Sequence, residues 1–144
     1  MITDTQVVLR LIIGAILGGL VGFEREMHNK KIAGFRTHIL VCVGSTLIML
    51  VSIYIFEAYS GIAPADPARI AAGVVTGIGF LGAGTIIRSG SSVMGLTTAA
   101  SLWTVSGIGL AVGCGFYIAG IVATVIVLAS LYILRLIPIS DTEK

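Results

Sequence analysis

The sequence predicts an all-α integral membrane protein, built as a bundle of five transmembrane helices. Hydrophobic residues make up 56% of the 144 residues and charged residues only 11%, whereas a soluble domain carries about 25% charged residues. The mean hydropathy is +1.06. Such a chain cannot cover its own surface with polar groups, and its net charge of +2 does not indicate nucleic-acid binding.

Five apolar segments define the expected helices, which together form one domain over residues 1–144. They cover residues 7–23, 39–56, 70–87, 93–112 and 116–134. Each is close to the length of about 20 residues that a helix needs to cross the hydrocarbon core. No segment alternates like a strand, and a helix satisfies its own backbone hydrogen bonds in lipid.

Lysine and arginine residues predict the orientation, because they are enriched in cytoplasmic loops. One side of the predicted bundle holds Arg25, Lys30, Lys31, Arg36, Arg88, Arg135 and Lys144, and the other holds Arg10 and Arg69. The N-terminus is therefore expected outside and the C-terminus in the cytoplasm. Arg10 lies within the first segment, so its side chain is expected to extend outward to the interface.

Glycine is abundant, at 19 residues, and small residues let helices pack closely in lipid. The glycines expected to matter are Gly14, Gly18 and Gly22 in the first helix and Gly77, Gly82 and Gly84 in the third. Two interpretations are open for the third helix: close packing, or a helix opened at its glycines so that backbone carbonyls face an ion. Trp103 falls at mid-depth of the fourth helix and is expected to pack inside the bundle.

Several polar side chains are expected together at the cytoplasmic ends of the helices. They are Glu24, Arg25, Arg36, Thr37, Arg88, Thr97 and Thr98. One interpretation is helix capping and extension of charges to water, with Arg36 pairing with Glu24 or Glu26. The other is a shared pocket, in which Arg36 and helix N-termini suit an anion or a carboxylate and the glutamates suit a cation.

On the outer side, Asp66 precedes Pro67 and is expected to cap the third helix. The alternative for Asp66 and Arg69 is a functional salt bridge or a role in ion entry. Either role would place these residues at the outer face.

The sequence shows no catalytic machinery, so an enzyme is not expected. No serine lies in a nucleophile motif, and His28 and His38 lack metal-ligand partners at the usual spacing. Cys42 and Cys114 form no metal motif and are expected to pack as small apolar residues.

Three long runs carry a family resemblance. They are GFEREMHNKKIAGFRTHILVCVGS (residues 22–45), DPARIAAGVVTGIGFLGAGTIIRSG (residues 66–90) and GLTTAASLWTVSGIGLAVGCGFY (residues 95–117). On these runs the chain resembles the membrane domain of the MgtC/SapB family. The resemblance implies a multi-pass protein of the plasma (inner) membrane of a prokaryote, linked to magnesium transport, stress adaptation and virulence. The residues that match its motifs are Arg25, Arg36, Thr37, Asp66, Arg69, Arg88, Thr97, Thr98 and Trp103.

Two departures limit what the resemblance implies. Gly73 stands where the family often has a polar glutamine, which weakens the case for a polar pore along the third helix. Family members commonly continue into a soluble domain of the ACT type, whereas this sequence ends at Lys144. That domain is expected to be absent, and functions that depend on it are not carried over.

The first functional hypothesis is an accessory or regulatory protein that binds an ion or a small anion, or docks a membrane transporter or ATPase. The alternative is a transporter or channel for Mg²⁺ or another small ion, formed by an oligomer. A third is a structural subunit that works only as an oligomer. Mg²⁺ prefers oxygen ligands, and no acidic residue lies at mid-membrane, which favours the first hypothesis.

The expected partners are the lipid bilayer and a second copy of the chain, as a homodimer or higher oligomer. Nucleic acid is not expected to bind. Mg²⁺ is the one candidate cofactor, and the sequence does not identify ligands for it.

Overall fold

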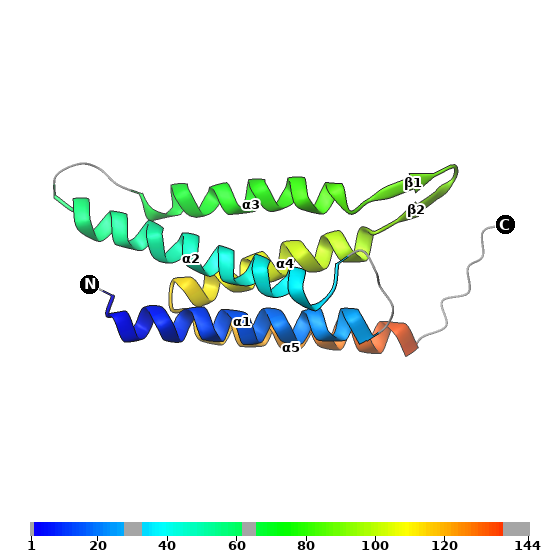
Figure 1. The fold of residues 1–144 in the computed structure, drawn as a ribbon, viewed down its shortest axis with the longest axis horizontal. Helices are drawn as coiled ribbons and strands as arrows, with labels where there is room; N and C mark the ends of the chain where they lie inside the picture. Colours follow the sequence, from blue (N-terminus) through cyan, green and yellow to red (C-terminus); the bar gives the residue numbers. More distant parts are fainter. Residues whose placement is uncertain (1, 28–32, 62–65, 137–144) are drawn as a thin grey trace.

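The described residues fold into five helices and one short β-hairpin (Figure 1). The computed structural model describes residues 2–27, 33–61 and 66–136. The helices are α1 (Asp4–Met27), α2 (Phe35–Tyr59), α3 (Pro67–Gly84), α4 (Leu96–Gly113) and α5 (Tyr117–Leu136), and the strands are β1 (Ile87–Ser89) and β2 (Ser92–Met94). The residues His28, Lys30, Lys31 and Lys144, which entered the predictions above, lie outside the described residues.

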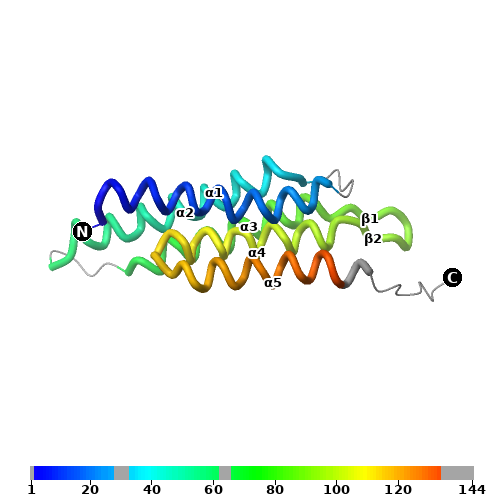
Figure 2. The backbone as a smooth tube through the Cα atoms, turned by 90° about the horizontal axis from the view of Figure 1, so that it is seen from below, coloured from blue at the N-terminus to red at the C-terminus, as the bar shows by residue number. Residues whose placement is uncertain are grey.

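The five helices run side by side along the long axis of the molecule, as Figures 1 and 2 show from two directions. α1 begins at one end and α5 finishes at the opposite end, so each helix carries the chain from one end to the other. We call the end that holds β1 and β2 the hairpin end. The last turn of α1 and the first turns of α2 and α4 meet there.

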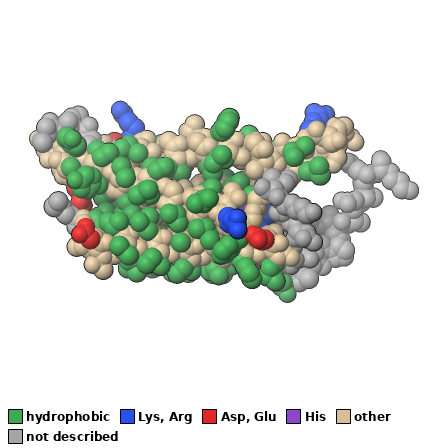
Figure 3. Space-filling view, in the orientation of Figure 1, with side chains coloured by type: hydrophobic (Ala, Val, Ile, Leu, Met, Phe, Trp, Pro, Cys, Tyr) green, Lys and Arg blue, Asp and Glu red, His purple; other side chains and the backbone are tan. Residues whose placement is uncertain are grey.

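Three helices, α1, α2 and α4, are long and apolar enough to cross a membrane, by their length and composition. α3 and α5 contain shorter apolar stretches, Pro67–Ala83 and Tyr117–Ile133. Large apolar side chains cover the outside of the bundle (Figure 3): Phe80 is 82% exposed, Ile118 73% and Leu40 71%. An outer surface of this kind suits lipid rather than water.

α2 lies between α1 and α4, and glycines on both neighbours allow the close approach. A Cβ atom added at Gly18 of α1 would lie 2.6 Å from Cys42 Cβ and 2.8 Å from His38 O. A Cβ atom added at Gly109 of α4 would overlap Cys42 O on the other side of α2. A side chain at either glycine would therefore push the helices apart.

The buried core joins α1, α2 and α4, and residues of α5 pack against it. Its buried members are Leu17, Val21, Cys42, Val105, Ile108 and Val112. On α4 the buried positions recur every three or four residues, as in Thr98, Leu102 and Val105. This is the period of one helix face, so the opposite face of α4 is left to the outside.

α3 attaches to the outside of this core through Ile78 and Gly82, its buried residues. An open groove of about 770 Å³ runs between α2 and α3. Its lining includes Gly44, Gly73 and Gly77, and a Cβ added at any of these three would meet no atom within 4 Å. The groove is therefore apolar and edged by small residues.

The region between α3 and α4 differs most from the prediction. Instead of helix ends around a loop, it forms an antiparallel hairpin in which Ile87 pairs with Met94 and Ser89 with Ser92. α3 ends at Gly84 because the chain turns there, with the hydroxyl and the N–H of Thr85 both donating to Gly82 O. The predicted helix end at residue 87 and helix start at residue 93 were therefore wrong, because these residues belong to β1 and β2.

The first two helices are longer than their apolar segments indicated. α1 covers residues 4–27 rather than 7–23, and α2 covers residues 35–59 rather than 39–56. Hydropathy marks the part of a helix that lies in lipid, and the polar end turns continue beyond it.

Candidate functional site

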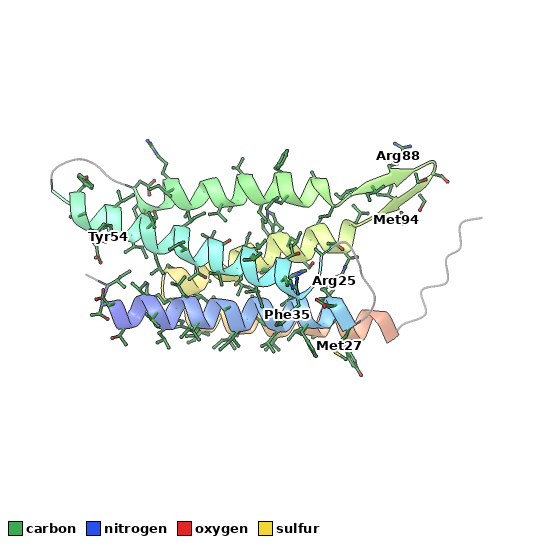
Figure 4. The ribbon with its side chains drawn as sticks, in the orientation of Figure 1. Arg25, Met27, Phe35, Tyr54, Arg88 and Met94 are labelled. Atoms are coloured by element: carbon green, nitrogen blue, oxygen red, sulfur yellow. The ribbon has the colours of Figure 1, made fainter. Side chains whose placement is uncertain are left out.

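A buried arginine lies where the last turn of α1 meets the first turn of α4. Arg25 is only 5% exposed, and Figure 4 shows its side chain between α1 and the start of α2. Its Nη2 donates a hydrogen bond of 2.7 Å to Thr98 Oγ1, and Thr98 is also buried. A buried charged side chain therefore links α1 to α4.

A buried histidine extends this contact to α2. His38 is fully buried, with Nδ1 lying 2.8 Å from Gly34 O and Nε2 lying 3.0 Å from Ser101 Oγ. Because a carbonyl oxygen only accepts, Nδ1 carries a hydrogen and donates it to Gly34 O. The Ser101 hydroxyl also donates to Thr98 O at 2.8 Å. We call Arg25, His38, Thr98 and Ser101 the Arg25 network.

The Arg25 network supplies few acceptors for its charged member. A guanidinium has several N–H donors. Within residues 2–27, 33–61 and 66–136, Thr98 Oγ1 is the one hydrogen-bond acceptor of Arg25, and the buried Nε has none. The carboxylate of Glu24 acts on Arg25 through its charge. Buried polar groups normally find a partner, so this Nε marks a site where an acceptor is missing.

Both helices that begin at this site bring the positive end of a helix dipole. Neither N-cap residue, Gly34 of α2 or Gly95 of α4, provides a side-chain cap. At α2 the carboxylate of Glu26 takes that role, because its Oε2 accepts from Phe35 N at 2.8 Å. The first turn of α4 contains no acidic residue.

Of the residues predicted for a shared pocket, the structure brings Arg25 and Thr98 together. Glu24 lies half-buried on the same turn as Arg25, whereas Arg36 and Thr97 are exposed. Arg36 does not reach the site because His38 occupies the buried face of α2. Arg36 and His38 are two positions apart, so their side chains point about 200° apart around the axis of α2.

The two other predicted pocket residues lie elsewhere. Thr37 lines the groove between α2 and α3. Arg88 belongs to β1 instead of ending a helix, and its Nε donates to Gly90 O at 3.2 Å. Figure 4 shows Arg88 on the hairpin, well away from Arg25.

His38 and Ser101 are the members of the network that sequence reasoning missed. The sequence offers His38 no metal-ligand partner at the usual spacing, and it predicts no other role for this residue. Its place beside Thr37, in the first turn of an apolar helix, signals that it needs a hydrogen-bond partner. Ser101 follows Thr98 by three positions, which puts both on one face of α4.

The predicted glycines of α1 and α3 have different surroundings. A Cβ at Gly14 would lie 2.6 Å from Thr46 Oγ1, and one at Gly22 would lie 2.8 Å from Phe35 Cα. A Cβ at Gly82 would meet Ala99 at an ordinary 3.6 Å, and one at Gly77 or Gly84 would meet nothing within 4 Å. α1 is thus in close contact along its glycines, whereas Gly77 and Gly84 of α3 have open space beside them.

Two predictions about α3 and α4 are corrected by the structure. α3 is a continuous helix over Pro67–Gly84, so its glycines do not open it and its carbonyls stay in helical hydrogen bonds. Trp103 does not pack inside the bundle, since it is 54% exposed. The buried face of α4 passes through Leu102, which leaves Trp103 about 100° away from it.

At the opposite end, the predicted cap of α3 is confirmed. Asp66 Oδ1 accepts from Ala68 N at 2.8 Å, with Pro67 opening the helix. Arg69 is exposed in the following turn.

Arg10 does not extend outward to water as predicted. Its Nη1 donates to Gly113 O at 2.7 Å and its Nε to Tyr117 OH at 3.3 Å. A cation at the carboxyl end of α4 is favoured by the helix dipole. Arg10 therefore joins α1 to the turn between α4 and α5.

Among the described residues, no group of three or more His, Cys, Asp or Glu side chains could hold a metal ion. The buried polar groups at the hairpin end are instead a guanidinium, an imidazole and hydroxyls. This donor set suits an anion or a neutral acceptor better than a hard cation.

Comparison with known proteins gives one consistent result. A model of the MgtC family matches residues 11–138. The candidate magnesium transporter YhiD of Escherichia coli K12 is 46% identical over 125 residues, which cover 85% of this chain and 58% of YhiD. Protein MgtC of Salmonella typhimurium LT2 is 42% identical over 128 residues, covering 89% of this chain and 52% of MgtC.

The chain spans about half the length of the curated relatives it matches. An uncharacterized protein of Haemophilus influenzae follows the same pattern, with 39% identity over 126 residues and 52% of its length covered. No solved structure matches the chain.

Proposed function

The chain belongs to the MgtC family, and we propose that it is a non-enzymatic accessory or regulatory protein of magnesium homeostasis in a prokaryotic plasma membrane. The name of its relative YhiD, a candidate magnesium transporter, supports the link to magnesium. The Arg25 network is the proposed responsive site. Because the relatives are longer, the proposal concerns what their shared membrane part does.

In the proposed topology all five helices cross the membrane and the hairpin end faces the cytoplasm. Each helix passes between the two ends of the molecule (Figure 1). The apolar stretches of α3 and α5 are the shortest, and they fall near the lower limit of about 17 residues for a spanning helix. Arg25, Arg36 and Arg88 lie towards the hairpin end and Arg10 and Arg69 towards the other, which fits the enrichment of cations on the cytoplasmic side.

One observation carries the choice of regulator over transporter: among the residues that the structure describes, the buried charged side chain is that of Arg25. A pathway for Mg²⁺ normally needs carboxylates, because this ion binds oxygen ligands and gives up its waters reluctantly. A buried guanidinium repels a divalent cation. The acidic residues of the described chain lie at helix ends or in turns: Asp4, Glu24, Glu26, Glu57 and Asp66.

Flux measurements test the proposal. The purified chain is sealed into liposomes that contain a Mg²⁺-sensitive dye, beside the Arg25→Gln and Arg36→Gln variants. We expect no Mg²⁺ entry above that of empty liposomes for any of the three proteins. Saturable entry through the wild type and Arg36→Gln, lost in Arg25→Gln, would instead establish a transporter.

The second candidate function is an ion path between subunits, or a complex with a membrane transporter or ATPase. The groove between α2 and α3 favours assembly of some kind, because Gly44, Gly73 and Gly77 leave its edges open. Small residues let another helix approach closely in lipid. A transporting oligomer would show Mg²⁺ entry that rises more steeply than the amount of protein in the liposome.

A further inference from the structure

We propose that Arg25 binds an oxyanion of the phosphate type at the hairpin end of the bundle. The inference deepens the proposed function and rests on it, since it names the class of ligand for the same site. Three observations carry it: the missing acceptor, the uncapped start of α4 and the depth of the site.

The missing acceptor is the first observation. Arg25 is 95% shielded, its Nη2 bonds to a neutral hydroxyl, and its buried Nε has no partner among the described residues. A buried charge without a matching partner is destabilising. A phosphate-type oxyanion presents several acceptor oxygens and a negative charge, which the planar guanidinium binds through paired hydrogen bonds.

The start of α4 is the second observation. Gly95, its N-cap residue, has φ 90° and no side chain that could cap the helix. Thr98, which holds Arg25, lies in this same first turn. Free backbone N–H groups and the dipole make such a turn favourable for an anion. A guanidinium held against the positive end of a helix is itself disfavoured unless an anion joins them.

The neighbouring carboxylates do not complete the site. Glu26 is exposed, and its Oε2 already accepts from Phe35 N at the start of α2. Glu24 acts on Arg25 through its charge, and the buried Nε of Arg25 still has no hydrogen-bond acceptor among the described residues. An added oxyanion supplies the second negative charge that this arrangement favours.

The depth of the site in the membrane, the third observation, indicates where the ligand could come from. The site comprises the last turn of α1 and the first turns of α2 and α4, so in the proposed topology it lies at headgroup level. A free phosphate from the cytoplasm and the phosphate of an anionic lipid can both reach this level. They share the chemistry that Arg25 recognises.

Binding is measured on the full chain by the phosphorus NMR linewidth and by the midpoint of thermal unfolding. One arm adds inorganic phosphate to protein in detergent, against chloride at the same ionic strength. The other arm compares lipid nanodiscs with and without phosphatidylglycerol. Arg36→Gln is the matched control for Arg25→Gln, because it removes the same charge from an exposed position in the first turn of α2.

We expect phosphate or phosphatidylglycerol to stabilise the wild type and Arg36→Gln. Loss of the charge-assisted hydrogen bonds should weaken binding to Arg25→Gln by about tenfold or more. If that variant does not fold, Arg25→Lys can replace it. Lysine keeps the positive charge but cannot form the paired hydrogen bonds of the guanidinium, so this variant should bind more weakly than the wild type. Equal binding by all variants, or no effect of either probe on the wild type, would overturn the inference.

Growth at low magnesium separates this inference from the proposed function. If neither probe binds but Arg25→Gln loses activity in cells, the oxyanion is refuted and the regulatory site stands. If a probe binds through Arg25 while Arg25→Gln remains fully active in cells, the oxyanion site stands and its regulatory role is refuted.

Discussion

At the scale of single residues, Arg25 sets the chemistry of the hairpin end. Its guanidinium is held by Thr98 Oγ1 at 2.7 Å, and the side chain is buried. The neutral partner holds the charge in position without cancelling it. The guanidinium favours an anion and disfavours Mg²⁺, and the carboxylate of Glu24 also acts on it through its charge.

The Arg25–Thr98 bond can be tested with a change that keeps the shape of the side chain. Thr98→Val removes the acceptor and leaves Arg25 buried without a hydrogen bond from the described residues. We expect unfolding in detergent to become easier by about 1–3 kcal/mol, the usual range for such a loss.

Thr97→Val is the matched control, because Thr97 is exposed beside Thr98. Its stability should stay within about 0.5 kcal/mol of the wild type. Equal unfolding midpoints for the two variants would show that the bond contributes nothing to the fold.

At the scale of elements, glycines determine which helices touch. α2 is closely approached by Gly14 and Gly18 of α1 and by Gly109 and Gly113 of α4. Gly73 and Gly77 of α3 have free space beside them. The same residue type therefore serves tight packing in the core and leaves an open edge on α3.

Gly18→Ala and Gly77→Ala should behave differently. A methyl group at Gly18 would lie 2.6 Å from Cys42 Cβ and 2.8 Å from His38 O. Such overpacking typically costs about 1–3 kcal/mol. At Gly77 the methyl group meets nothing, so stability should be unchanged or slightly raised by the helix propensity of alanine.

Thermal unfolding in detergent distinguishes the two variants. A Gly18→Ala protein as stable as Gly77→Ala would mean that α1 and α2 are farther apart than described here.

The sequence predicted where the helices lie along the chain better than it predicted which face of each helix is buried. Five apolar segments marked the five helices, because each helix contains a long apolar run that hydropathy detects. The hairpin was missed because each strand has only three residues, too few to show a period. Trp103 was misplaced because apolar residues lie all around α4, so hydropathy alone does not reveal which face is buried.

The same limit applies to the candidate site. The sequence indicated a polar cluster at the hairpin end and included Arg25 and Thr98. It could not tell that His38 rather than Arg36 faces the bundle, since both lie in the first turn of one helix. That choice depends on how α2 rotates against Gly18 and Gly22 of α1, which is a property of packing.

At the scale of the whole molecule, the proposed orientation of the five helices in the membrane can be tested with a cysteine label. Cys114 is exposed in the turn between α4 and α5, and Cys42 is buried in the core. If the hairpin end faces the cytoplasm, Cys114 lies outside. A maleimide that cannot cross membranes should label the protein in intact cells.

Cys114→Ser is the control for this labelling and should abolish it, since Cys42 is shielded. Labelling of the wild type only after the cells are opened would reverse the proposed orientation.

The central claim is that the Arg25 network is the site through which this protein acts. The most direct measurement is growth at limiting Mg²⁺ of cells that lack their own family member and carry the wild type, Arg25→Gln or Arg36→Gln at equal membrane levels. We expect Arg36→Gln to restore growth like the wild type and Arg25→Gln to fail to restore it. Full restoration of growth by Arg25→Gln would show that the protein does not act through the Arg25 network.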